Sequence, residues 1–399
     1  MTESKLPCGE PQPAIRFEDD HFFAYPAIRW SLSHLRDLAR TATVKHDPAA
    51  QSAEGIAAPA SQDALEVLRF TDLDGHERTW SAGLEDTYTD GILVLHRGRR
   101  LYERYFGALQ KDLPHACFSV TKSYVATLAA SLVHEGALDE GALIRHFLPE
   151  LADSAFADAS LREVMDMQVG IAYAENYADP RTDFWAYSRA SGLRPDATDA
   201  TGSRTIHGYL RDLKKLGDHG SAFAYKSVNT EVLSWVITRL SGESLPALLS
   251  RRIWSRLGCE FGANLVIDTE GTAMAGAGLS ACLRDLARFG ELMRCEGAWQ
   301  SAQVIPAAVV ADIRRGGDKA RFVPAGYKLL AGYSYRNMWW VSHNEFGMFE
   351  ARGIHGQRLY IAPGAELVIA RFASHPTAAN SANDPITLPA FLALARHVA

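Results

Sequence analysis

Ser119 and Lys122 lie three residues apart in the run Ser119-Val120-Thr121-Lys122. On one helix turn they could act as a nucleophile and its base. A serine hydroxyl is a poor nucleophile near pH 7 until a base removes its proton, and a lysine can do this when burial or nearby positive charge destabilises its ammonium. Of the nine lysines, only Lys122 has a serine at this offset. The alternative is that Ser119 only caps the helix and Lys122 is solvated.

A second element is the stretch Tyr225–Thr230, which stands just ahead of a predicted helix. A phenol near a lysine can be held as a phenolate or can pass a proton, so Tyr225 with a lysine forms a base without histidine. Tyr225 could equally be a packing residue, and Ser227 and Asn229 could be helix caps. Two such elements in this order indicate acyl transfer more strongly than either does separately.

A third element is Gly353–Gln357, which precedes the predicted strand 358–362. Glycine lets the backbone approach a ligand closely, and a backbone N–H here is a plausible second donor for an oxyanion hole beside the N–H of Ser119. The alternative is an ordinary glycine-containing turn, in which His355 is a structural histidine.

Composition limits the possible functions. The chain has 399 residues with 47% hydrophobic and 22% charged residues, enough for a large core in one large domain or two. A net charge of -6 gives no basic surplus for nucleic acid or anionic lipid. The five cysteines are far apart without a C-x-x-C pair, and neither a signal-peptide core nor a run of eighteen apolar residues is present. We therefore predict a cytoplasmic protein with reduced thiols and a small-molecule partner.

The elements that must position these residues follow from periodicity. Two β-rich runs around Arg97-Gly98-Arg99 predict a hairpin over 91–107. Apolar residues at helical spacing predict a helix from Ser119 that stops at Gly136. Near the C-terminus, two alternating runs around Pro363-Gly364 predict a second hairpin, and 388–399 predicts an amphipathic helix.

These elements predict an α+β fold. The β-rich ends, 63–136 and 274–399, would form one discontinuous domain around an antiparallel sheet. The mostly helical segment 137–273 would be an inserted domain, with the active site in the cleft between the two parts. Residues 1–62 are predicted to be an N-terminal extension or linker, because they mix Pro, Ala, Ser and Gln.

Six blocks between about residues 90 and 375 carry a family resemblance. They are SVTKS, MDMQVGIAYAENYADP, YKSVNTEVLSW, RDLARFGELM, MWWVSHNE and GIHGQRLYIAP. In this order they resemble the serine hydrolases of the β-lactamase and penicillin-binding fold, and most closely the class C-like esterases and 6-aminohexanoate-dimer (nylon oligomer) hydrolases. The resemblance implies an antiparallel sheet flanked by helices, no metal or organic cofactor, and a possible homodimer.

The resemblance also implies roles for individual residues. The nucleophile falls on Ser119, the lysine on Lys122, the tyrosine on Tyr225 and the second oxyanion N–H on Ile354. Candidate substrate-binding residues are Tyr177, Ser188, Ser227 and Trp340.

Three positions depart from the family pattern. Ala351-Arg352-Gly353 stands where β-lactamases and peptidases have K-T-G, whose cationic group helps to hold a substrate carboxylate. Ser188 stands where nylon-dimer hydrolases can carry an acid for the substrate ammonium, and Gly276 occupies the polar partner position. Good turnover of amino-terminated oligomers is therefore not expected.

Other polar residues are predicted to be structural or solvated. Glu175, Asp179 and Asp183 are read as solvated loop charges. His343, Glu345 and His355 lack the H-E-x-x-H spacing of a helical metal site.

The sequence thus predicts a serine hydrolase that cleaves small esters or amides through an acyl-enzyme on Ser119. A β-lactamase or DD-peptidase is the alternative enzyme. A non-catalytic ligand-binding or sensor module is the alternative of another class. Transfer of the acyl group to an alcohol or amine also fits these residues.

Overall fold

The computed structural model describes residues 15–50, 63–195 and 202–399. Its largest sheet is antiparallel, with seven strands in the order β11-β12-β13-β14-β15-β4-β5. The predicted hairpins are present as β4 with β5 and as β14 with β15. The strands are β4 (Thr89–His96), β5 (Arg99–Tyr105), β11 (Ser334–Arg336), β12 (Trp339–Val341), β13 (Phe349–Gly353), β14 (Gln357–Ala362) and β15 (Leu367–Ala373).

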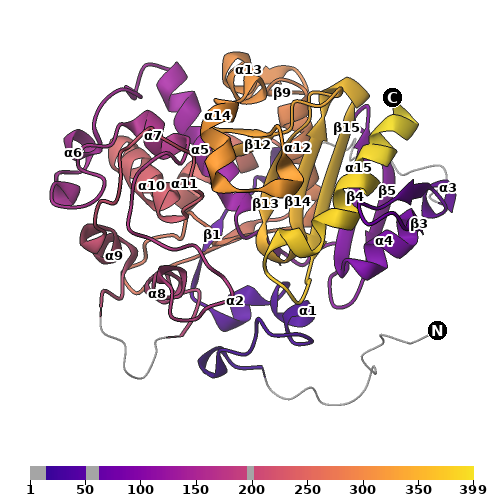
Figure 1. Cartoon of the computed structure of the whole chain (residues 1–399), viewed down its shortest axis with the longest axis horizontal. Helices are drawn as coiled ribbons and strands as arrows, with labels where there is room; N and C mark the ends of the chain where they lie inside the picture. The colour runs from indigo at the N-terminus through magenta and orange to yellow at the C-terminus, as the bar shows by residue number, and fades with distance from the viewer. Residues whose placement is uncertain (1–14, 51–62, 196–201) are drawn as a thin grey trace.

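Both faces of this sheet are covered, as the alternation in β4 illustrates. Leu93 and Leu95 belong to one hydrophobic core, and Ile92 and Val94 belong to another. Successive side chains of a strand point to opposite faces, so a strand buried on both faces reads as a continuous apolar run. Helix α12 (Leu283–Arg294) packs on the first face, and α4 (Trp80–Asp86) with α15 (Asp384–Val398) packs on the second (Figure 1).

Helices dominate the stretch between 137 and 273. The long helix α10 (Val228–Ser241) packs against α5 (Val120–His134) and α7 (Leu161–Met165). The predicted division into 63–136 plus 274–399 and 137–273 stays a prediction. The other helices of this stretch are α6 (Ile144–Phe147), α8 (Asp183–Ala190), α9 (Ile206–Asp212) and α11 (Leu245–Leu249), which a π-helical turn, Ser250–Trp254, continues.

Part of the predicted N-terminal extension packs on the core. Strand β1 (Thr41–Val44) pairs with β7 (Ala263–Val266) in a four-stranded sheet of order β1-β7-β8-β6, completed by β8 (Leu279–Ala281) and β6 (His115–Ala116). Residues 51–62 of this predicted extension lie outside the described residues. The remaining elements are α1 (Ile28–Ser31), α2 (Leu35–Leu38), α3 (Asp63–Glu66), β2 (Arg69–Thr71), β3 (Glu77–Thr79), β9 (Ala298–Trp299), β10 (Ala302–Gln303), α13 (Ala307–Arg315) and α14 (Lys319–Phe322).

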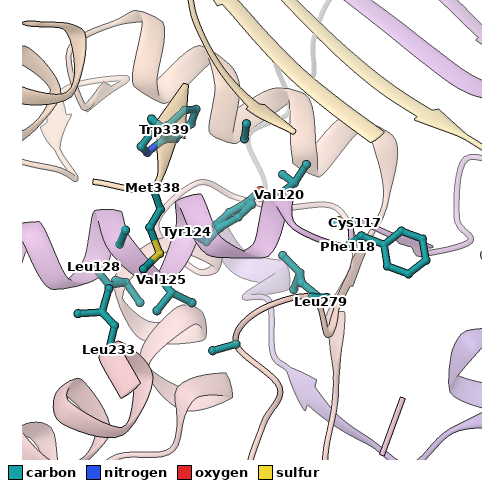
Figure 2. Close-up of a cluster of buried hydrophobic side chains, with 14 of the residues drawn as sticks. Cys117, Phe118, Val120, Tyr124, Val125, Leu128, Leu233, Leu279, Met338 and Trp339 are labelled. Atoms are coloured by element: carbon teal, nitrogen blue, oxygen red, sulfur yellow. The ribbon is translucent and has the colours of Figure 1, made fainter. Parts of the chain in front are cut away.

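Helix α5 is buried over nearly its whole length, from Val120 to Leu132. Figure 2 shows its side chains Tyr124 and Val125 among residues that come from other elements, including Leu233 of α10 and Trp339 of β12. The indole N–H of Trp339 donates to the Thr127 hydroxyl at 3.2 Å, which ties the helix to the sheet. A helix held from several sides fixes whatever stands at its N-terminus.

Across the described ranges, none of the helices is both long and apolar enough to cross a lipid bilayer.

Candidate active site

Ser119 stands at the N-terminus of α5, but its hydroxyl does not cap the helix. Lys122 Nζ donates instead to Ser119 Oγ at 2.7 Å and to the Gly276 carbonyl oxygen at 2.6 Å. Lys122 is only 1% exposed. The alternative in which Ser119 caps and Lys122 is solvated is therefore wrong.

A strained turn presents Ser119. The preceding residue, Phe118, has φ of 45°, in the left-handed region that a bulky side chain rarely adopts. The Thr121 hydroxyl holds the turn by donating to the Phe118 carbonyl at 2.6 Å, and the Cys117 N–H donates to the Leu279 carbonyl at 2.7 Å. Non-glycine residues in this region persist only where the surroundings enforce them, and they concentrate at functional sites.

Burial changes the acid strength of Lys122. It lowers the lysine pKa to about 8, while the charges of Glu175 and Glu231 act in the opposite direction. The ammonium also lies 5.0 Å from the ring centroid of Tyr225. Because an ordinary lysine has a pKa of about 10.4, the neutral amine that a base requires is far more populated here.

Tyr225 lies two residues before the N-cap of α10 and is half-buried. Its ring stacks on Trp340 with 5.5 Å between ring centroids. Burial raises the tyrosine pKa well above its ordinary value and Glu175 adds to the rise, whereas a hydrogen bond with Ser119 lowers it. The phenol is thus protonated at neutral pH, which favours passing a proton over acting as a phenolate.

The turn that carries Ile354 comes close to Ser119 because of Gly353. A Cβ atom at Gly353 would lie 2.6 Å from the carbonyl oxygen of Cys117, so only glycine allows this approach of β13. Gln357 Nε2 donates to the Ile354 carbonyl at 3.1 Å and to the backbone of β15 at 2.6 Å. Ile354 and Ser119 consequently line one cavity.

His355 is held by backbone groups. Its ring Nδ1 lies 2.7 Å from the His375 carbonyl oxygen, and its backbone N–H donates to the Ala378 carbonyl at 2.9 Å. Burial lowers the pKa of His355 to about 4. The structural reading of this histidine is the one that the contacts support.

A cavity of about 610 Å³ opens beside Ser119 and is lined from both predicted parts of the chain. Tyr177 and Trp340 lie on its wall, where the sequence placed them. A second cavity of about 540 Å³ shares Tyr177 and Ala379 with the first. The aromatic and apolar side chains of the first cavity include Tyr177, Tyr225, Tyr327, Leu329, Leu330, Trp340 and Ile354, and its polar ones include Lys328, Arg352, Asn380, Ser381 and Asp384.

Two predicted substrate-binding serines do not reach this wall. Ser188 is fully buried in α8 and donates its hydroxyl hydrogen to the Phe184 carbonyl at 2.8 Å. Ser227 is also buried, and its hydroxyl donates to Glu175 at 2.5 Å. Neither lines the cavity beside Ser119, so the geometry does not support their predicted contact with substrate.

The reading of Glu175 as a solvated loop charge is wrong. Its carboxylate is half-buried and accepts from the Ser227 N–H at 2.7 Å and from the Tyr177 hydroxyl at 3.1 Å. A carboxylate fits here because these donors replace water. Asp179 pairs with an exposed arginine, as a loop charge does, whereas Asp183 accepts from the Ala174 N–H at 2.8 Å.

No role for Glu231 or Tyr187 was predicted from the sequence. Glu231 accepts from the N–H groups of Ala275 and Gly276 at 3.0 and 2.8 Å, and the Tyr187 hydroxyl donates to the same carboxylate. The sequence does contain a signal for a buried carboxylate. Val228, Glu231, Val232 and Trp235 stand at i, i+3, i+4 and i+7 of α10, so Glu231 lies on an otherwise apolar stripe. A carboxylate on a buried stripe needs partners.

Arg352 occupies the place of the family's cationic recognition motif, but its charge is compensated. The guanidinium donates to Glu350 at 2.8 Å and to both oxygens of Asp384 at 2.7 and 2.6 Å. These carboxylates hold the pKa of Arg352 above its ordinary value. Arg352 and Asp384 both line the cavity beside Ser119.

One group of described residues brings three metal-ligand atoms together, namely Asp72, Asp74 and His76. These residues lie at the turn between β2 and β3 and do not line the cavity beside Ser119. Asp72 is already bound to Arg78 at 2.6 Å.

Comparison with known proteins assigns the family. The profile described as Beta-lactamase matches residues 78–390, well over half of the chain. The chain belongs to the beta-lactamase family. A 6-aminohexanoate-dimer hydrolase of Paenarthrobacter ureafaciens is 33% identical to this beta-lactamase family member over 353 residues, which cover 88% of this chain and 86% of that protein.

Solved structures agree with this assignment. A Bacillus anthracis protein described as a candidate 6-aminohexanoate-dimer hydrolase superposes with a TM-score of 0.87 and 31% identity, covering 96% of this chain and 97% of its own. A penicillin-binding protein homologue from Caulobacter crescentus superposes with a TM-score of 0.59 at 15% identity, covering 79% of this chain and 96% of its own, and shows the fold alone. The predicted β-lactamase and penicillin-binding-like α+β fold is confirmed, and the chain is a serine hydrolase of this family.

Proposed function

We propose that the protein hydrolyses small esters or amides through an acyl-enzyme on Ser119. The observation that carries the proposal is the 2.7 Å hydrogen bond between Lys122 Nζ and Ser119 Oγ in a buried site. A lysine with a pKa of about 8 is partly neutral near physiological pH and can accept the serine proton.

The geometry supports a sequence of balanced steps. Neutral Lys122 takes the proton of Ser119 as Oγ attacks the substrate carbonyl, and the developing oxyanion binds to the N–H groups of Ser119 and Ile354. Tyr225 passes a proton to the leaving alcohol or amine, and the bond to the acyl group breaks. Water then attacks the acyl carbon and gives up a proton to the Tyr225 phenolate, while the Lys122 ammonium returns its proton to Ser119 Oγ as the acid leaves.

The cavity supports substrates of modest size. Its volume of about 610 Å³ lies within the usual range of about 300–1,000 Å³ for small-molecule sites. A relative named for hydrolysis of the 6-aminohexanoate dimer supports linear amides as one substrate class. Because the serine at position 188 is buried away from the cavity, we propose uncharged acyl chains in place of chains that end in an ammonium.

A β-lactamase or peptidase function has less support. Enzymes of that kind use a cation to hold the substrate carboxylate, and Arg352 already binds Glu350 and Asp384. A substrate carboxylate would have to displace one of these buried partners, which costs free energy.

A substrate panel tests the proposal. Nitrophenyl esters, a linear amino-acid amide, a nylon oligomer and a cephalosporin would be offered to wild type, Ser119→Ala and Ser131→Ala. Ser131 is the matched control, because it lies on the same helix and its hydroxyl donates to the Thr127 carbonyl at 2.8 Å. We expect wild type and Ser131→Ala to turn over short esters or amides, and Ser119→Ala to turn over neither. Equal turnover by Ser119→Ala, or faster turnover of the cephalosporin than of every ester and amide, would reject the proposal.

The cytoplasmic location and the homodimer stay predictions from the sequence. Sedimentation of the purified chain at several concentrations measures the second directly. A single species of monomer mass, 43.7 kDa, at all concentrations would contradict it.

A further inference from the structure

A buried carboxylate stands behind the lysine. Glu231, in the first turn of α10, is 2% exposed. Its two oxygens accept from consecutive backbone groups, the N–H of Ala275 at 3.0 Å and the N–H of Gly276 at 2.8 Å. The hydroxyl of Tyr187, from α8, donates to the same carboxylate. Three donors thus fix the position of one buried anion.

The backbone at Gly276 also contacts Lys122. While the Gly276 N–H bonds to Glu231, the Gly276 carbonyl accepts from Lys122 Nζ at 2.6 Å. No side chain fits at Gly276, because a Cβ atom there would lie 2.4 Å from the Tyr187 hydroxyl and 3.0 Å from Glu231 Oε1. A continuous chain of hydrogen bonds therefore links Tyr187, Glu231, Gly276, Lys122 and Ser119.

We propose that Glu231, supported by Tyr187, is a positioning residue that aims the Gly276 carbonyl at Lys122 and controls the protonation of that lysine. The inference rests on the proposed function, since it takes Lys122 to be the base for Ser119. Glu231 itself does not line the cavity beside Ser119. It acts through the backbone of residues 275–276 and through its charge.

The charges around the two groups give the direction of the effect. Glu175 and Glu231 face Lys122 with negative charge and both raise its pKa, and the ring of Tyr225 lies beside its ammonium. Glu231 faces Tyr187 and Lys122, and burial raises the pKa of Glu231 to about 7. The pKa of Lys122 is about 8. The two groups therefore titrate over neighbouring pH ranges and influence each other.

Glu231→Gln is the direct test. Without the negative charge, the pKa of Lys122 falls further, so the neutral amine appears at lower pH. The glutamine keeps one acceptor oxygen, but its NH₂ group faces a backbone N–H, so the Gly276 carbonyl is held less accurately. We expect the acid limb of the pH–rate profile to move down by about half a pH unit or more and the maximal rate to fall about tenfold.

The rate to measure is the labelling of Ser119 by a fluorophosphonate between pH 5.5 and 9.5. In this reaction Oγ forms a bond to phosphorus, fluoride leaves, and the serine proton passes to Lys122. Tyr187→Phe provides a milder variant that keeps the carboxylate and its backbone bonds. The hydrogen bond from Tyr187 lowers the pKa of Glu231. Without this bond the pKa of Glu231 rises, so Glu231 stays neutral over a wider pH range. The limb should move in the same direction by less.

Asp285 offers a matched control on α12. Its carboxylate also accepts from two consecutive backbone groups, the N–H of Glu260 at 2.7 Å and the N–H of Phe261 at 3.1 Å. It is equally buried, and burial raises its pKa to about 6. Asp285 does not line the cavity beside Ser119, so Asp285→Asn should lower thermal stability and leave the pH profile of labelling unchanged.

The outcomes separate this inference from the proposed function. Labelling of Ser119→Ala at the wild-type rate rejects the proposed function. If only Ser119 is labelled but the acid limb of Glu231→Gln coincides with that of wild type, the role of Glu231 is rejected and the proposed function stands. An equal shift in Asp285→Asn also rejects that role, because it would reflect general loss of packing. If Glu231→Gln does not fold, Tyr187→Phe provides the test. An acid limb that stays at the wild-type pH in Tyr187→Phe then rejects the role of Glu231.

Discussion

The two sides of the cavity differ in how they are held. On the reacting side, Ser119 and Lys122 are buried and joined by hydrogen bonds to residues of several elements. Another part of the wall comes from the segment 323–330, which exposes apolar side chains to solvent, with Val323 at 72%, Tyr327 at 38% and Leu329 at 40%. A rigid reacting side keeps donor and acceptor distances constant, whereas an exposed segment tolerates substitution. We therefore expect that mutations can change chemistry and substrate choice separately in this fold.

The largest effect is expected when the reacting side loses its amine. Lys122→Met keeps an unbranched apolar side chain and removes the base, so kcat/KM for a nitrophenyl ester should fall about 10³-fold or more. Thermal stability should hold or rise, because a buried amine is replaced by an apolar group. Lys215→Met, at a surface lysine that pairs with Asp158, is the control and should match wild type. Wild-type activity in Lys122→Met would show that the buried amine is not the base.

Tyr225→Phe should separate the two halves of the reaction. An amine leaving group needs a proton, whereas nitrophenolate does not, so the loss should be about 10²–10³-fold for an amide and clearly smaller for a nitrophenyl ester. Tyr335→Phe is the neighbouring control, since its ring lies 6.2 Å from that of Tyr225 but does not line the cavity. Equal losses on both substrates would mean that Tyr225 does not serve the leaving group.

The pH dependence of kcat/KM reports the reacting side without mutation. Lys122 works as a base only when neutral, and its pKa is about 8, so activity should rise with pH through this value. Between pH 6 and pH 8 the neutral fraction increases about 50-fold by the Henderson–Hasselbalch relation, and kcat/KM for an uncharged ester should follow. A flat profile across this interval would contradict a buried lysine base.

The smallest effect is expected on the exposed side. Leu329→Ala removes part of the cavity wall, which should raise KM for a longer acyl ester about fivefold and leave kcat and the KM of an acetyl ester nearly unchanged. Val323→Ala is the matched control, since this exposed residue of the same segment does not line the cavity. A large drop in kcat for Leu329→Ala would break the distinction between the two sides.

The sequence predicted those features whose signal is local. The helix after Ser119 and the hairpins of β4 with β5 and β14 with β15 follow from periodicity and turn residues, and all are present. The juxtaposition of Ser119, Lys122 and Tyr225 came from the family blocks, because no local pattern shows which distant segments meet. The structure brings these three together.

The missed features depend on long-range packing. Glu231 bonds to Gly276, 45 residues away, and this partner is invisible in the local sequence. Ser188 was expected at the cavity, but the packing of α8 buries its hydroxyl against the Phe184 carbonyl. Glu175 reads as a loop charge, yet the Ser227 N–H and the Tyr177 hydroxyl bind it. Which face of a helix or loop turns inward is decided by tertiary contacts.

The most direct test of the central claim is the intact mass of the protein after reaction with a fluorophosphonate, followed by peptide mapping. The account predicts one adduct on wild type and on Ser131→Ala, located at Ser119, and none on Ser119→Ala. An unlabelled wild type, or an adduct that persists on another residue of Ser119→Ala, would contradict it.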